Sequence, residues 1–174
     1  RLSLYQYLKE AADQYPEKTA LIYNQDQITY QEMISNIDRL AAVYAEMGLK
    51  KGDRVALMVP NSPAYVYSFY GAMRQGLVVV QINPLLTPKE LGFIVRDTKA
   101  RALVVADAMF SMIEEAMLEQ AVDNIIITPL IGDKIEADVL YLEEILQQAR
   151  PEPPHVLVNP EDDIAVLQYT SGTT

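Results

Sequence analysis

The residues best suited to chemistry are the last five of the chain, Thr170-Ser171-Gly172-Thr173-Thr174. They follow residues 164–169, an apolar run that is typical of a buried strand. Where a strand enters small hydroxyl residues around a glycine, backbone N–H groups and hydroxyls can converge on one point and bind phosphate without a large positive charge. From these residues alone two interpretations stay open: an anion-binding loop, or a solvated tail without a function.

The two common glycine-rich nucleotide motifs do not occur in the sequence. A Walker A loop requires a glycine, four residues, a second glycine and then Lys-Ser or Lys-Thr, and a dinucleotide fold requires G-x-G-x-x-G. A nucleotide bound by this chain would therefore be held by a loop of another kind.

Three pairs of adjacent carboxylates and a single histidine are the remaining candidates for acid–base chemistry: Glu114-Glu115, Glu143-Glu144, Asp162-Asp163 and His155. Adjacent helical residues point about 100° apart, so we expect the two glutamate pairs to lie on solvated faces rather than to face one substrate. The two aspartates stand where polar residues often precede a strand. The histidine follows a proline-rich segment, where we expect a hydrated side chain rather than a catalytic one. We therefore assign no catalytic residue.

Composition limits the classes of function that need to be considered. The 174 residues include 14 Lys and Arg against 24 Asp and Glu, which gives a net charge of −10, and half of the residues are hydrophobic. This composition excludes intrinsic disorder and disfavours nucleic acid as a partner, because polyanions are bound by clustered Lys and Arg. The chain has no cysteine and one histidine. Disulfides, zinc–thiolate sites, iron–sulfur clusters and thiol nucleophiles are thereby excluded.

The location predicted for the protein is cytoplasmic, with no transmembrane segment. No run of eighteen apolar residues occurs, and the first fifteen residues lack the apolar core of a signal peptide. The chain begins with Arg1 rather than Met and stops directly after the hydroxyl-rich run. We expect both ends to be cuts in a longer polypeptide.

Apolar periodicity predicts helices that alternate with short strands. Ser3 is expected to cap a first helix whose buried face holds Leu4, Tyr7, Leu8, Ala11, Ala12 and Tyr15. Residues 20–23 and 27–30 predict a hairpin. Thr29 with Glu32 forms a capping box for a helix that ends at Gly48 in a left-handed conformation.

Five further runs predict strands that do not alternate between apolar and polar residues: 54–59, 77–82, 102–106, 124–128 and 164–169. Helices are expected between them, over 64–74, over 88–95 and from Asp107 to Met117, and a short one over 140–149. Ser62 and Thr87 are the predicted caps, each followed by a proline. Strands without alternation, separated by helices, indicate a parallel sheet that is covered on both faces. The predicted fold class is α/β, with a mostly parallel sheet flanked by helices.

The proline-rich segment suggests a division of the chain. Residues 150–154 contain three prolines and cannot be helical. We therefore predict an N-terminal α/β subdomain over 1–149 and a linker over 150–160. The remaining segment, 161–174, is predicted to hold a strand and the truncated phosphate-binding loop of the next subdomain, into which the strand leads.

Six segments in order resemble the N-terminal portion of the adenylate-forming (AMP-binding) acyl-CoA synthetase family. They are PEKTAL (16–21), ITYQE (28–32), GLKKGDRVA (48–56), PNS (60–62), NPLLTPKEL (83–91) and DIAVLQYTSGTT (163–174). The likeness spans nearly the whole chain. The lead-in Gln168-Tyr169 and the stretch 80–85 look most like bacterial long-chain fatty-acid–CoA ligases.

The resemblance implies a two-step reaction in which ATP and a fatty acid give an acyl-adenylate, whose acyl group then passes to coenzyme A. By the family's loop motif, Thr170, Ser171, Thr173 and Thr174 would donate to phosphate oxygens, and Gly172 would supply backbone freedom. Thr170 would also be a ligand of Mg²⁺. The family's adenine site and catalytic lysine lie later in its sequences, so the isolated 174-residue chain is predicted to be inactive.

Alternatives to this interpretation stay open. The parent could load a carrier protein instead of coenzyme A, or the chain could be a non-catalytic α/β interaction module. A homodimer and a peripheral contact with a membrane are likewise undecided. Upstream of the loop, we expect Gly52 and Asp53 to make a turn and Asn83-Pro84 a strand exit, without contact to the substrate.

Overall fold

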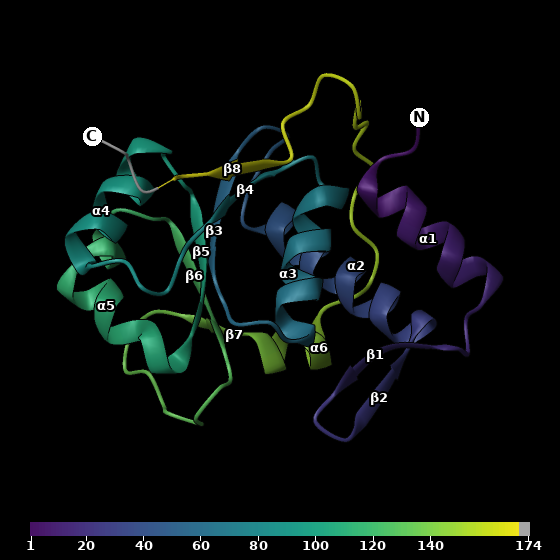
Figure 1. Ribbon diagram of the computed structural model, residues 1–174, viewed down its shortest axis with the longest axis horizontal. Coiled ribbons are helices and arrows are strands. Elements are labelled where there is room, and N and C mark those ends of the chain that lie inside the picture. Colours follow the sequence, from purple (N-terminus) through teal and green to yellow (C-terminus); the bar gives the residue numbers. More distant parts are fainter. Residues whose placement is uncertain (171–174) are drawn as a thin grey trace.

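A six-stranded parallel sheet forms the centre of the computed structural model, which describes residues 1–170 (Figure 1). The strand order is β7-β6-β5-β3-β4-β8. Their bounds are β3 Arg54–Met58, β4 Val78–Gln81, β5 Ala102–Ala106, β6 Asn124–Thr128, β7 Leu140–Tyr141 and β8 Val166–Gln168. The predicted α/β class is confirmed.

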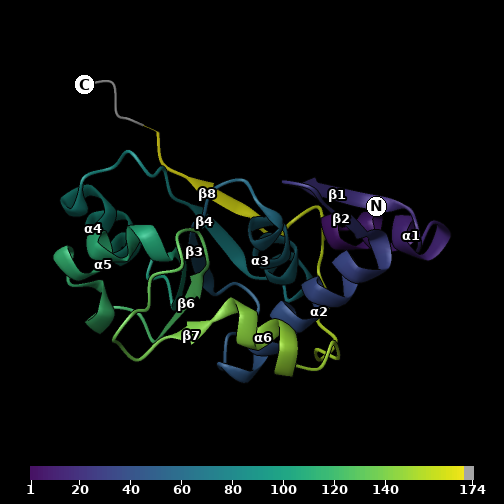
Figure 2. The ribbon, with the colours of Figure 1, turned by 90° about the horizontal axis from the view of Figure 1, so that it is seen from below.

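Helices cover both faces of the sheet (Figures 1 and 2). On one face lie α2 (Tyr30–Glu46), α3 (Pro63–Arg74) and α6 (Leu142–Gln148), and α1 (Leu4–Gln14) packs against α2 and α3 on their outer side. On the other face lie α4 (Pro88–Asp97) and α5 (Phe110–Glu115). Within β3, Val55 and Leu57 belong to the first core, and Ala56 and Met58 to the second. Both side-chain directions are buried, which explains why the strand sequences do not alternate.

The antiparallel hairpin of β1 (Thr19–Tyr23) and β2 (Asp26–Thr29) stands apart from the main sheet and leads into α2. The predicted caps are confirmed. The hydroxyls of Ser3, Thr29, Ser62 and Thr87 each accept a hydrogen bond from the backbone N–H three residues on, at 3.2–3.3 Å. Gly48 ends α2 with φ of +81°. These contacts are local in sequence, and sequence patterns therefore predict them well.

The buried face predicted for α1 is confirmed at Ala12 and wrong at Leu4 and Tyr7. Tyr5 and Ala12 are buried, whereas Leu4 is 46% exposed and Tyr7 is 60% exposed. The Tyr5 hydroxyl donates to the buried Asp38 of α2 at 2.9 Å, and Arg74 of α3 pairs with the same carboxylate. These polar contacts join α1, α2 and α3 and turn Tyr5 toward the core. The spacing of apolar residues along α1 gives no information about such contacts, so it did not predict this orientation.

Three other predicted elements differ in extent. The helix expected from Asp107 to Met117 is a 3₁₀ turn, Asp107–Met109, followed by α5, which ends at Glu115. Met117 has φ of +54° and is exposed, and the chain turns there into a second 3₁₀ turn, Leu118–Gln120, whose Leu118 is fully buried. The helix predicted over 140–149 begins only at Leu142, because Leu140–Tyr141 pair with β6. The last strand is shorter than the predicted 164–169.

Helices α2 and α3 approach each other closely at Gly71. A Cβ atom at this position would lie 2.9 Å from the Leu40 Cβ and 3.1 Å from the Ile37 carbonyl oxygen. The absence of a side chain therefore permits the packing of the two helices that fill the first core.

The segment predicted as a linker, 150–160, contains no helix or strand and lies against the rest of the molecule. The Gln75 side chain donates to the Pro154 carbonyl at 3.1 Å, and Lys51 Nζ donates to the Leu157 carbonyl at 2.9 Å. Beyond it, β8 joins the main sheet beside β4. The division into subdomains stays a prediction. Among residues 1–170, no helix has the length and apolar character needed to cross a bilayer.

Candidate functional site

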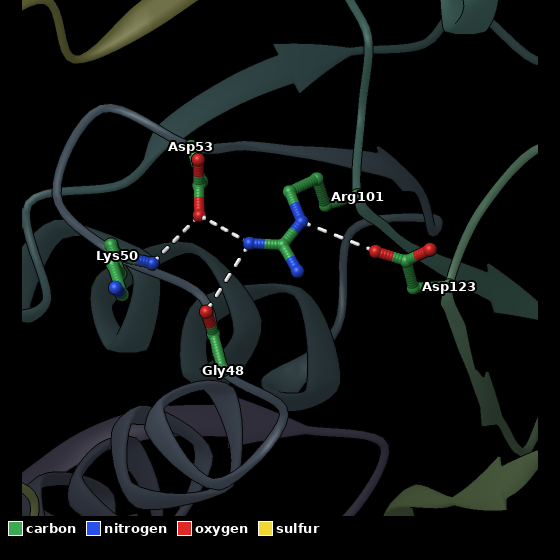
Figure 3. A network of polar contacts seen from close by, with 5 residues as sticks. All are labelled: Gly48, Lys50, Asp53, Arg101 and Asp123. Carbon is green, nitrogen blue, oxygen red and sulfur yellow. Dashed lines mark hydrogen bonds and ion pairs between the residues drawn. The ribbon is translucent and has the colours of Figure 1, made fainter.

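A network of polar contacts joins neighbouring segments at the amino end of the sheet (Figure 3). Arg101, just before β5, donates to Asp53 at 2.9 Å, to Asp123 at 3.1 Å and to the Gly48 carbonyl at 3.2 Å. The hydrogen bond to Asp123, followed by the one to Asp53, raises the pKa of the Arg101 guanidinium above its usual value. The network joins the segments that enter β3, β5 and β6, and its charges satisfy one another.

Asp53 also accepts from the Lys50 N–H at 2.7 Å, and Gly52 has φ of +88°. The turn predicted at Gly52 and Asp53 is thus confirmed. Its position at the amino end places it away from the carboxyl ends of the strands, where α/β sheets bind their ligands.

At the carboxyl end of the sheet, β4 and β8 finish side by side. Gln81 and Gln168 are register partners, and the strands are parallel, so the segments that follow both strands leave the sheet together. Asn83 and Pro84 form the predicted exit from β4, where the Asn83 side chain accepts the Leu85 N–H at 2.9 Å. Thr170 follows β8 by two residues, which brings the start of the predicted phosphate-binding segment to this edge.

A cavity of about 920 Å³ lies at this edge, between the ends of β4 and β8 and one face of α4. Its described lining is Gln81, Ile82, Asn83, Pro84, Leu86, Thr87, Lys89, Glu90, Phe93, Ile94, Gln168, Tyr169 and Thr170. Lys89 is the one cationic residue in this described lining. The neighbouring Glu90 carboxylate accepts the Thr87 N–H at 2.8 Å, and this bond and the one from the Thr87 hydroxyl lower the pKa of Glu90. A cavity with both polar and apolar walls suits an organic ligand that carries charged groups.

Tyr169 connects the end of β8 to α4. Its hydroxyl donates to the carboxylate of Asp97, the last residue of α4. This hydrogen bond raises the pKa of the Tyr169 phenol, with smaller effects from partial burial and from the negative charge of Asp97. The hydroxyl therefore stays protonated, and remains a donor, throughout the neutral range.

The predicted site residues fall partly outside the described structure. Thr170 is described, is exposed and lines the cavity. Ser171, Gly172, Thr173 and Thr174 lie outside the described residues. Within 1–170, no group of three or more His, Cys, Asp or Glu side chains is arranged to hold a metal ion. The roles of Thr170 toward phosphate and Mg²⁺ stay predictions.

Comparison with known proteins assigns the chain to a family. The sequence profile of the family described as "AMP-binding enzyme" matches residues 8–174, nearly the whole chain. This chain belongs to the AMP-binding enzyme family. The resemblance of its motifs to adenylate-forming acyl-CoA synthetases is thereby confirmed.

Two curated relatives of this AMP-binding enzyme are long-chain-fatty-acid–CoA ligases. The protein from Bacillus subtilis is 34% identical over 194 residues, and the one from Salmonella typhimurium is 30% identical over 196 residues. Each alignment covers 99% of this chain and 35% of the relative. The chain thus spans about a third of the length of the curated relatives that it matches.

Solved structures share the fold. A fatty acyl CoA synthetase from Mycobacterium tuberculosis superposes with a TM-score of 0.81 at 28% identity, over 97% of this chain and 32% of that one. The anthranilate CoA ligase AuaEII, solved with anthranoyl-AMP, gives a TM-score of 0.89 over 99% of this chain and 33% of that one. At 24% identity the second likeness concerns the fold alone. The parallel sheet with its flanking helices is that of the N-terminal region of adenylate-forming enzymes.

The carboxylate pairs and the histidine that sequence analysis considered for acid–base chemistry are either exposed to solvent or paired within the fold. The glutamates of both pairs are exposed, as expected for solvated faces, and His155 is exposed as well. Asp163 pairs with Lys51 at 2.7 Å and accepts the Asn159 N–H at 2.6 Å. The Lys51 contact, followed by the Asn159 bond, lowers the pKa of the Asp163 carboxyl. Asp163 thus holds the approach to β8 in place.

Sequence reasoning missed Asp107, which follows β5 at the carboxyl end of the sheet. Its buried carboxylate accepts N–H groups from Ala108 (2.6 Å), Leu130 (3.1 Å), Ile131 (3.1 Å) and Gly132 (2.8 Å). Burial raises the pKa of this carboxyl, but the four backbone donors outweigh burial and hold the pKa below its ordinary value. The available signal was an acid directly after a wholly apolar strand, which sequence analysis treated only as a helix start.

Proposed function

We propose that the chain is the N-terminal part of an ATP-dependent acid–thiol ligase that adenylates a long-chain fatty acid and passes the acyl group to coenzyme A. The observation that carries the proposal is the position of Thr170 at the carboxyl end of the parallel sheet, on a cavity lined also by Lys89. Family membership and the names of the curated relatives support the same activity.

In this proposal, residues 170–174 bind the polyphosphate of the substrate ATP. The hydroxyls of Thr170, Ser171, Thr173 and Thr174 donate to phosphate oxygens, and Gly172 gives the backbone its freedom to turn N–H groups the same way. These donors oppose the negative charge that grows on the departing pyrophosphate. Removal of one donor of this kind costs about 3 kcal/mol of transition-state stabilisation.

The residues present fit a magnesium ion that is held mainly by its substrate. Mg²⁺ prefers oxygen ligands, keeps several waters and is often bound through one or two protein groups together with phosphates. Thr170 offers such an oxygen, and the described residues contain no competing cluster of carboxylates or histidines. Thr170 would hold the ion, which would supply further neutralisation of phosphate charge.

Pyrophosphate exchange by the complete gene product tests the proposal. With ATP, Mg²⁺ and a panel of fatty acids, labelled pyrophosphate should enter ATP, and addition of coenzyme A should yield AMP and acyl-CoA. Failure to exchange with any acid would contradict the proposal. Acyl transfer to a phosphopantetheinyl protein, but not to free coenzyme A, would keep the adenylation and replace the acceptor.

The same assay applies to the 174-residue chain alone. We expect no exchange from it, because the family's adenine site and catalytic lysine lie beyond the matched region. Exchange by the purified chain at a rate comparable to that of the complete protein would show that this expectation is wrong.

A further inference from the structure

The hydrogen bond between Tyr169 and Asp97 links two parts of the chain that are 72 residues apart. Tyr169 stands directly before Thr170, and Asp97 ends α4. Strand β8 has only three residues and lies at the edge of the sheet, where it pairs with β4 on one side. The pairing of β8 with β4 ends at Gln168. The hydrogen bond of the next residue, Tyr169, then connects the end of β8 to α4.

Helix α4, which carries Asp97, is held in place by residues buried in the second core. Leu91, Ile94 and Val95 are buried in the second core, and the Thr98 hydroxyl donates to the Ile94 carbonyl at 2.8 Å, just past the end of the helix. Asp97 forms no ion pair with any residue in the described part of the chain, and Tyr169 is its side-chain donor there. The carboxylate is therefore free to accept the phenol.

The same helix forms one wall of the cavity that Thr170 lines. A bond from the residue before Thr170 to the end of α4 fixes the end of β8 relative to that wall. Active-site groups act best when surrounding contacts hold them in the productive geometry before the ligand arrives.

We propose that Tyr169 is a positioning residue, whose hydroxyl, donated to Asp97, fixes where the chain leaves β8 and how Thr170 faces the cavity. This inference rests on the proposed phosphate-binding role of residues 170–174. Loss of the bond should weaken the binding of ATP and leave the binding of the fatty acid unchanged.

The test compares hydroxyl deletions in the complete gene product. Tyr169→Phe and Asp97→Ala should each raise the KM for ATP by about five- to tenfold, a factor in the range expected for loss of one ordinary, partly solvated hydrogen bond. The KM for the fatty acid should not change. Asp97→Asn keeps an acceptor oxygen and should lie between the wild type and Asp97→Ala. In the double variant Tyr169→Phe/Asp97→Ala, the effects should be less than multiplicative, because both changes remove one bond.

Tyr141→Phe is the matched control. The Tyr141 hydroxyl also bonds to protein, donating to the Ile135 carbonyl at 3.0 Å and accepting its N–H at 2.9 Å, but on the opposite edge of the sheet. Its removal should lower thermal stability without a change in the KM for ATP. Equal changes in that KM for Tyr141→Phe and Tyr169→Phe would assign the effect to general destabilisation and overturn the proposal.

Amide hydrogen exchange separates this proposal from the function on which it rests. In Tyr169→Phe the amides that pair β8 (Val166–Gln168) with β4 should exchange at least about fivefold faster, and in Tyr141→Phe they should not. Exchange in β8 that is unchanged in Tyr169→Phe would overturn the positioning role, even in an active enzyme. If the complete protein shows no pyrophosphate exchange with any acid, the proposed function is wrong, whatever the β8 amides do.

Discussion

The two ends of the same parallel sheet are built in opposite ways. At the amino end, the Arg101 guanidinium is bound by Asp53, Asp123 and the Gly48 carbonyl, so that these three charged side chains are paired with one another (Figure 3). At the carboxyl end, β4 and β8 open onto a cavity lined by Lys89 and Thr170. The difference shows which polar residues serve the fold and which are available to a ligand.

The contrast follows from parallel topology. All six strands point the same way, so every connection from a strand to its following helix starts at the carboxyl end. These connections vary without disturbing the pairing of the strands, and ligands of open α/β sheets bind there. Asp107 is an instructive exception, because it lies at the carboxyl end yet its carboxylate is fully used by backbone donors.

The largest effect is expected from removal of hydroxyls at the carboxyl end. In the complete gene product, Thr170→Val combined with Ser171→Ala should lower kcat/KM for pyrophosphate exchange by at least about 100-fold, because each lost donor leaves phosphate charge less stabilised. Steady-state exchange kinetics measure this. Activity within about threefold of wild type would contradict the claim that the hydroxyls at the carboxyl end of the sheet bind the phosphates of ATP.

The next effect is on stability. Asp107→Ala should lower the free energy of unfolding of the 174-residue chain by about 2 kcal/mol, because the Leu130, Ile131 and Gly132 amides lose a charged acceptor. Urea denaturation followed by circular dichroism measures this. A change below about 0.5 kcal/mol would show that the Asp107 contacts contribute little.

The same carboxyl predicts a pH dependence. Its folded pKa lies below its ordinary value, so the stability that it contributes is complete above the unfolded pKa, about 3.9, and is lost as the pH falls through the lower folded pKa. Asp163, whose pKa is also lowered, acts with the same sign. Unfolding at a series of pH values should show a shallower acid loss in Asp107→Asn than in wild type. Parallel curves would contradict the assignment.

The smallest effect is expected at the amino end. Arg101→Met should destabilise the chain less than Asp107→Ala, because the guanidinium is partly solvated and its ion pairs are screened. The KM for ATP of the complete protein should stay within about twofold of wild type. A larger rise in that KM would erase the functional difference between the two ends of the sheet.

The sequence predicted those features that depend on neighbouring residues. Caps such as Thr29 with Glu32 join groups three residues apart, and the buried strands follow from runs of apolar residues. The contacts that sequence analysis missed join distant residues. Tyr5 and Asp38 are 33 residues apart in the sequence, and Tyr169 and Asp97 are 72 residues apart. No local sequence pattern predicts that such distant residues form a hydrogen bond. Of the candidate site, the motif identified Thr170, but only the fold brings it beside Lys89 and α4.

A structure of the complete protein with ATP and Mg²⁺ tests the central claim most directly. The account predicts β- or γ-phosphate oxygens within hydrogen-bonding distance of the Thr170 hydroxyl, at the carboxyl end of β8. A triphosphate bound elsewhere, with Thr170 in contact only with solvent, would contradict it.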